Sequence, residues 1–356
     1  MGYRARMSSR TLGFMLAGAG AIAFSGKAIV AKLMYRYGVD AFTVVGLRMA
    51  LALPFFAAMA WWSSRRSGGR APARLTGRDG WQIAALGFCG YYLASTLDFL
   101  GLQYISASLE RAILYLNPTM VLLLGVMLRG ERPRPAQLGA VLLAYAGVAV
   151  VWLHDWDAVS APLAVAASAG LNPVRAVAVG SVLVLGSAIS YAVYLMGSSS
   201  LVGRLGSARL VGLASIFACG LALAQWAVVS AIGHSAMTWL PSAPPPAHAA
   251  LAHAQGVGAA FGGIPWQVWA LSLLNAVLCT VLPVWLVMRG VQLLGASIAS
   301  QVGMVGPLST IWMAAWFLDE PITGRLTLGT GAILLGIVWL AQVGRSQLPS
   351  GAKSRA

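Results

Sequence analysis

Long apolar stretches dominate the chain, and short polar segments rich in Arg separate them. A helix that spans the hydrocarbon core of a membrane needs about 20 mostly apolar residues. Stretches of this kind predict ten membrane helices, near residues 11–33, 41–62, 80–101, 107–128, 136–153, 176–198, 209–232, 266–288, 295–318 and 326–343. The predicted fold class is therefore an all-α polytopic membrane protein with ten transmembrane helices.

The distribution of charge predicts how these helices are oriented. Only 9% of the 356 residues are charged, against about 25% in a soluble domain, yet the formal net charge is +15. The basic residues lie mainly between alternate apolar stretches, without the aromatic platforms of a nucleic-acid site, so we expect no nucleic-acid partner. Basic segments stay on the cytoplasmic side of a membrane, which predicts that both termini are cytoplasmic. An even number of helices requires the two termini to share a side.

Cys and His offer no metal, cofactor or catalytic motif. The three Cys lie in apolar stretches without a CxxC pair, and the four His lie in predicted loops without an HExxH motif. A membrane-embedded enzyme would need metal ligands or a nucleophile–base pair within the helices. The sequence therefore predicts no enzyme activity and no cofactor.

The two halves of the chain repeat each other. A shift of 189 residues aligns Pro118 with Pro307, Glu131 with Glu320 and Gly147 with Gly336, and a weaker shift of 167 aligns the first helix with the sixth. Each half then holds five helices. Because five is odd, the second half is expected to be inverted relative to the first. Inverted repeats are typical of secondary transporters, and the alternative is a duplicated bundle or receptor that transports nothing.

These features predict five consecutive segments. They are a cytoplasmic N-terminus (1–10), a first five-helix repeat (11–153), an outside linker (154–175), a second five-helix repeat (176–343) that contains an outside insertion rich in Pro, Ala and Gly (234–265), and a cytoplasmic tail (344–356).

Two copies of one helix motif resemble a known family. The first copy runs Ala107-Ser108, Pro118 and Gly130-Glu131, and the second runs Ala296-Ser297, Pro307 and Asp319-Glu320-Pro321. The sequence resembles the EamA family of the drug/metabolite transporter superfamily over about 11–343. The resemblance implies a ten-helix transporter of small metabolites in a bacterial inner membrane, commonly an exporter, and leaves the substrate open.

Ionisable residues inside the predicted helices are the strongest site candidates, because burying a charge in a bilayer is unfavourable. Lys27 lies about two-thirds along the first helix, where it either contacts an anionic substrate group or forms a static salt bridge. Glu110, Arg111 and Asp98 are expected to form a charge network for coupling, with Glu110 the first choice for binding a proton and Asp98 the second. Arg48 is close to a helix end, and the snorkelling of its side chain to the lipid headgroups explains it adequately.

Neutral polar residues at helical spacing suggest a polar face around the same site. The residues predicted to bind substrate with Lys27 are Tyr91, Asn117, Tyr191, Tyr194, Asn275 and Gln301. Each of them has an alternative role as a hydrogen bond that joins packed helices. Pro118 and Pro307 interrupt helices and are expected to act as gating hinges or as static kinks.

The sequence therefore predicts a secondary transporter that carries a small metabolite or drug-like solute through the inner membrane by alternating access. Proton coupling through Glu110 is left open beside an uncoupled facilitator or a lipid translocator. The expected partners are a small-molecule substrate, the lipid bilayer and, under coupling, protons, whereas the sequence leaves the oligomeric state open.

Overall fold

The computed structural model describes residues 9–65, 75–130, 135–157, 173–232, 264–294, 302 and 305–345, and every regular element in these ranges is a helix. The elements are α1 (Ser9–Arg36), α2 (Ala41–Arg65), α3 (Gly77–Gly87), the π-helical η1 (Phe88–Leu93), α4 (Ala94–Leu102), α5 (Ala107–Leu114), α6 (Asn117–Arg129), α7 (Pro135–Asp157), α9 (Pro173–Leu205), α10 (Ser207–Ile232), α13 (Trp266–Ala276), the π-helical η3 (Val277–Val281), α14 (Leu282–Leu294), α16 (Val305–Leu318) and α17 (Gly324–Arg345).

Eight helical stretches among the described residues are long and apolar enough to cross a membrane. Two shorter apolar helices, Leu308–Leu318 and Gly324–Leu340, accompany them. The prediction of an all-helical, multi-pass membrane protein is confirmed for this part of the chain.

The helices depart from the predicted ranges in three ways. The helix predicted at 107–128 is broken at Tyr115 and Leu116, between α5 and α6. The one predicted at 176–198 is longer than expected, because α9 runs from Pro173 to Leu205. The helices predicted at 80–101 and 266–288 each contain a π-helical turn, η1 and η3.

Several predicted features lie outside the described residues. They are Gln301, Glu131, the Ala296-Ser297 pair, most of the linker 154–175 and of the insertion 234–265, and most of both terminal segments. The helix predicted at 295–318 is described at residue 302 and from Val305 onward.

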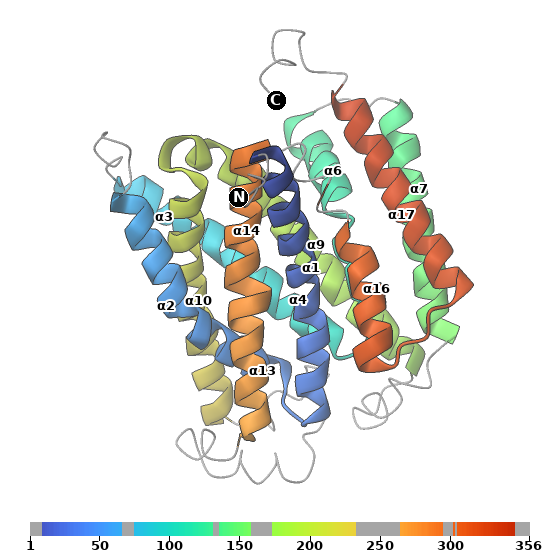
Figure 1. Cartoon of the computed structure of the whole chain (residues 1–356), viewed down its shortest axis with the longest axis horizontal. Helices are drawn as coiled ribbons and strands as arrows, with labels where there is room; N and C mark the ends of the chain where they lie inside the picture. The colour runs from blue at the N-terminus through green and yellow to red at the C-terminus, as the bar shows by residue number, and fades with distance from the viewer. Residues whose placement is uncertain are drawn as a thin grey trace, which may run out of the picture.

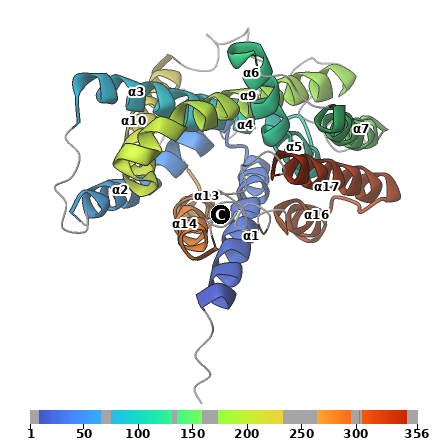
Figure 2. The ribbon, with the colours of Figure 1, turned by 90° about the horizontal axis from the view of Figure 1, so that it is seen from above.

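The bundle has two outer helix pairs and a central group (Figures 1 and 2). Helices α2 and α10 pair at one edge, and α7 and α17 pair at the opposite edge. Between them α1 packs on α14 and α16, and α4 packs on α9. Helix α1 begins and α17 ends at the same end of the bundle, which we call the terminal end (Figure 1). The other end is called the opposite end.

Glycine contacts hold α2 against α10. A Cβ atom at Gly46 would lie 2.6 Å from Cγ of Trp226, and one at Gly212 would lie 2.9 Å from both Cβ and the backbone nitrogen of Ala60. Gly46 and Gly212 are 166 residues apart, and so are Ala60 and Trp226. The α2–α10 interface therefore makes one contact twice, with the roles of the two helices exchanged.

The α7–α17 pair shows the same exchange. A Cβ atom at Gly147 would lie 2.6 Å from the carbonyl oxygen of Gly329, and one at Gly336 would lie 2.7 Å from that of Ala140. Both residue pairs are related by the shift of 189 that aligns the sequence, as are the first residues of η1 and η3, Phe88 and Val277. Small residues allow such close approach between membrane helices, where packing rather than the hydrophobic effect drives association.

Replacing Gly212 with Val is expected to destabilise the protein, whereas Gly220→Val in the same helix is not. The Gly212 side chain would overlap the backbone of Ala60, and Gly220 has no neighbouring atom within 4 Å of the position of a Cβ. Overpacking of this kind costs about 1–3 kcal/mol. Thermal unfolding of the two variants in detergent measures the difference, and equal melting temperatures would contradict the tight α2–α10 contact.

Candidate functional site

Five charged side chains are buried together in the half of the bundle nearer the opposite end. The exposed fractions are 7% for Lys27, 3% for Arg48, 1% for Asp98, 0% for Glu110 and 4% for Arg111. Lys27 lies nine residues before the end of α1, about 13 Å along the helix axis. Charges this deep are stabilised by pairing with one another or by a ligand.

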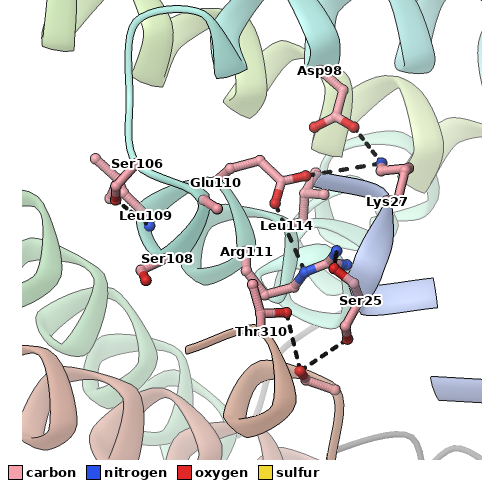
Figure 3. Close-up of polar contacts among 12 residues, drawn as sticks. Ser25, Lys27, Asp98, Ser106, Ser108, Leu109, Glu110, Arg111, Leu114 and Thr310 are labelled. Carbon is pink, nitrogen blue, oxygen red and sulfur yellow. Dashed lines mark hydrogen bonds and ion pairs between the residues drawn. The ribbon is translucent and has the colours of Figure 1, made fainter. Parts of the chain in front are cut away.

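Lys27 is the centre of the network (Figure 3). Its Nζ donates a hydrogen bond to Oδ2 of Asp98 on α4 and lies 3.9 Å from Oε1 of Glu110 on α5. One cation from α1 therefore faces two carboxylates from two other helices. This contact joins the three helices that carry the network.

Arg111 extends the network towards α16. Its Nε lies 3.8 Å from Oε2 of Glu110, and its Nη2 donates to the carbonyl oxygen of Ser25, at 3.4 Å. The hydroxyl of Ser25 donates in turn to the carbonyl oxygen of Gly306, at 2.9 Å, and so does that of Thr310, at 3.1 Å. Figure 3 shows these groups converging between α1, α5 and α16.

Aromatic rings separate the cations of the site. Nζ of Lys27 lies 5.4 Å from the ring centres of both Phe24 and Phe99, and the guanidinium carbon of Arg111 lies 5.7 Å from that of Phe24. The guanidinium of Arg48 lies 4.6 Å from the Phe99 ring. Cations are attracted to ring faces, so the rings partly replace water around these charges.

Arg48 does not snorkel to the membrane surface, and that prediction was wrong. The side chain is 97% buried within the bundle and faces Phe99 and Thr280, because the face of α2 that carries it packs inward. Its neighbours one turn away, Val44 and Ala52, are fully buried. The spacing of these apolar residues could have shown that Arg48 faces into the bundle. Its position near a helix end instead suggested that the side chain snorkels to the headgroups.

The start of α5 is fixed by caps at the opposite end. The hydroxyl of Ser106 accepts from the backbone N–H of Leu109, at 2.9 Å, which satisfies a free donor of the first turn. Oε1 of Glu320, from the segment after α16, accepts from the N–H of Ala107, also at 2.9 Å. These caps place Glu110 and Arg111 on the first two turns of α5, facing Lys27.

The break after α5 depends on Asn117 and Pro118. Pro118 lacks an N–H and restricts the residue before it, and it occupies the first turn of α6, where a helix tolerates proline. The Asn117 amide donates to the carbonyl oxygen of Leu114, at 2.6 Å. Pro307, which the shift of 189 aligns with Pro118, is a residue of α16. Pro118 therefore begins a helix rather than bending its middle.

The second half contributes neutral groups to the site. Nδ2 of Asn275 on α13 donates to the carbonyl oxygen of Lys27, at 3.4 Å. Thr280 on η3 donates to the carbonyl oxygen of Asn275, at 2.9 Å, and lies 3.5 Å from Nη1 of Arg48. Asn275 therefore lies beside Lys27, where the sequence predicted a substrate-binding residue.

The three predicted tyrosines form a cluster of their own. The hydroxyls of Tyr91 and Tyr194 are 3.0 Å apart, and the rings of Tyr191 and Tyr194 stack with centres 5.5 Å apart. Tyr194 packs with Leu201 and Leu205, near the end of α9, and against Gly90. The structure therefore joins Lys27, Asp98, Glu110, Arg111 and Asn275, and it groups the tyrosines elsewhere on α9 and η1.

Several buried polar atoms of the site have no hydrogen-bond partner among the described residues. They are Nε and Nη2 of Arg48, Oδ1 of Asp98, both carboxylate oxygens of Glu110, Nε of Arg111 and Oδ1 of Asn275. Unsatisfied polar atoms inside a protein are unfavourable, so their concentration here makes this cluster the candidate site.

Asp98→Asn is expected to lower the free energy of unfolding by about 3–5 kcal/mol, because it leaves Lys27 without its closest carboxylate. Adding Lys27→Met removes the orphaned charge and is expected to restore most of that loss. Thermal and chemical unfolding in detergent measure both steps. The exposed pair Arg36–Asp319 supplies the control, because Asp319→Asn should change stability by less than about 1 kcal/mol. A double variant that is less stable than Asp98→Asn would refute the pairing.

Comparison with known proteins identifies the family. The sequence model of the EamA-like transporter family matches residues 11–153 and 178–342. A relative from Bacillus subtilis (strain 168), named "Uncharacterized transporter YcbK", is 27% identical over 318 residues, which cover 89% of each chain. A structure described only as "Crystal structure of protein" aligns with a TM-score of 0.52 and 15% identity over 95% of this chain and 99% of that one, which shows a shared fold. The chain is a multi-pass membrane transporter and belongs to the EamA-like transporter family.

Proposed function

We propose that this transporter exports a small solute with an anionic or zwitterionic group across a bacterial inner membrane, by alternating access between two inverted five-helix repeats. The observation that carries the proposal is the buried network of Lys27, Asp98 and Glu110, whose charges come from the first half and meet neutral groups of the second half. Ionisable groups in that position between helices typically mark a transport pathway.

Several observations support the repeat. The family model matches two separate stretches of the chain, 11–153 and 178–342. The glycine contacts of α2–α10 and α7–α17 are each made twice with exchanged partners, which is what a pseudo-twofold axis produces. Helix α1 begins and α17 ends at one end of the bundle, in keeping with cytoplasmic termini (Figure 1). These features support five helices in each half, with the halves related by inversion.

Contacts between the halves at both ends support alternating access. At the opposite end, Glu320 of the second half accepts hydrogen bonds from the N–H of Ala107 and the hydroxyl of Ser108 in the first half. At the terminal end, Nη2 of Arg204 donates to Oδ1 of Asp79, at 2.6 Å. A transport cycle opens one of these contacts while the other holds. Both are polar and near the bundle ends, so they can exchange with water as they open.

The double variant Lys27→Met/Asp98→Asn is expected to fold and to lose export. It removes a neutral ion pair and with it the group that faces the solute. Bacterial cells that express the protein, the double variant, the Asp319→Asn control or an empty vector are compared by mass spectrometry of the medium. We expect at least one small metabolite to accumulate outside with the wild-type and control proteins only. Equal export by the double variant, or no difference between wild type and vector, would disprove the proposal.

Coupling to protons is assigned to Glu110, because it is fully buried and both of its carboxylate oxygens lack hydrogen-bond partners among the described residues. In liposomes that contain the exported solute, a pH gradient is expected to drive accumulation by the wild-type protein. Glu110→Gln should abolish that accumulation and retain downhill exchange at a measurable rate. If the pH gradient does not change the transport rate of the wild-type protein, the protein is an uncoupled facilitator.

A further inference from the structure

Arg48 carries a buried charge that has no ion pair among the described residues. The carboxylates of Asp98 and Glu110 face Lys27 and Arg111, and no carboxylate oxygen of the described residues lies within 4.0 Å of the Arg48 nitrogens. The site therefore holds three cations and two carboxylates. Arg stays protonated in proteins, so the site carries one positive charge in excess while Glu110 is ionised, which is the state in which it can accept the coupling proton.

The free donors of Arg48 lie on one edge of its guanidinium. Nη1 points to Thr280 and the guanidinium carbon lies over the Phe99 ring, whereas Nε and Nη2 have no acceptor among the described residues. Nε–H and Nη2–H are the two parallel donors of the side edge of a guanidinium. A carboxylate binds to such an edge through two hydrogen bonds, with both of its oxygens in the same plane.

We propose that Arg48 binds a carboxylate of the transported solute through Nε and Nη2; this rests on the proposed transport function and names the chemical class of its cargo. One bound monoanion balances the single excess charge of the site. While Glu110 is ionised, a phosphate dianion would leave an excess of negative charge, and a halide offers one atom to two parallel donors. The carboxylate therefore fits both the charge and the geometry of the free edge.

The surroundings of Arg48 support a ligand rather than a permanent protein partner. The Thr280 contact is long, at 3.5 Å, and Oδ1 of Asn275, whose backbone carbonyl accepts from Thr280, has no donor among the described residues. Arg48 and Lys27 lie over the same Phe99 ring, so an anion on Arg48 would be close to the Lys27–Asp98 pair. The solute would thereby meet the charges that we assign to transport.

The test compares anion-dependent stability in nanodiscs of phosphatidylcholine, which lacks a carboxylate headgroup. Sodium acetate and sodium benzoate are the probes, each against its carboxamide and against sodium chloride at equal ionic strength. We expect both carboxylates to raise the melting temperature of the wild-type protein by several degrees. A ligand at 100 times its Kd stabilises by about 2.7 kcal/mol, so even weak probes give a measurable shift at high concentration.

Arg48→Met is expected to abolish the carboxylate-specific shift and to raise the melting temperature without anions, because an unpaired buried charge is removed. Arg48→Lys keeps the charge without the planar edge and should retain less than half of the shift. Arg289→Gln, at an exposed position on α14, is the matched control and should retain the full shift.

The results separate this site from the transport proposal. A shift that persists in Arg48→Met, or no carboxylate-specific shift in the wild-type protein, overturns the role of Arg48. Stabilisation through Arg48 by phosphatidylserine alone, equal to that by acetate, identifies a lipid headgroup as the occupant and overturns the solute assignment. An Arg48-dependent acetate shift in a protein that exports nothing leaves the anion site in place and disproves only transport.

Discussion

The contact between Lys27 and the carboxylates of Asp98 and Glu110 is the constraint on which the centre of this bundle depends. In a bilayer an unpaired charge is unfavourable, so α1, α4 and α5 must meet at the depth of Lys27. Glu110 reaches that depth because α5 begins nearby, with its first turn capped by Ser106 and Glu320. The helix then stops at Leu114, and α6 starts again at Asn117. Glu110 and Arg111 lie near the start of α5, which is too short to cross the membrane alone. The span therefore contains a break between α5 and α6.

The edges of the bundle are built differently from its centre. At α2–α10 and α7–α17 the helices approach so closely that a methyl group has no room at Gly46, Gly147, Gly212 or Gly336. The obstacle is the Trp226 side chain at Gly46 and includes backbone atoms at the other three. Such contacts have one good packing arrangement and resist sliding. Around Lys27 the contacts are polar, and several are long, including the 3.4 Å bonds from Arg111 and Asn275. In the proposed transport cycle, the tightly packed pairs α2–α10 and α7–α17 each move as a unit, while the polar contacts around Lys27 change partners.

Hydropathy was sufficient to predict the helical membrane fold, because the length of a span is set by the bilayer rather than by tertiary contacts. It also identified Lys27, Asp98, Glu110 and Arg111, since charges in apolar helices need partners whichever helices supply them. The sequence did not reveal which partners meet. Tyr194 has the helical spacing of a site residue, yet it packs with Tyr91 and Gly90 in a separate cluster. Arg48 was misassigned because position along a helix indicates depth, whereas the direction in which a side chain faces depends on packing with other helices.

The buried charges of the site are distributed unevenly between the two halves of the chain. The two halves make matched packing contacts, but the five buried charges of the site all come from α1, α2, α4 and α5. The shift of 167 aligns Lys27 with Tyr194, and the shift of 189 aligns Asp98 with Val287. Under the proposed transport mechanism, a solute held by charge binds chiefly to one half, while the other half contributes neutral groups such as Asn275. In that mechanism, movement of the second half changes which end of the site is open without breaking the ionic contacts, so the binding free energy is not lost at each step of the cycle.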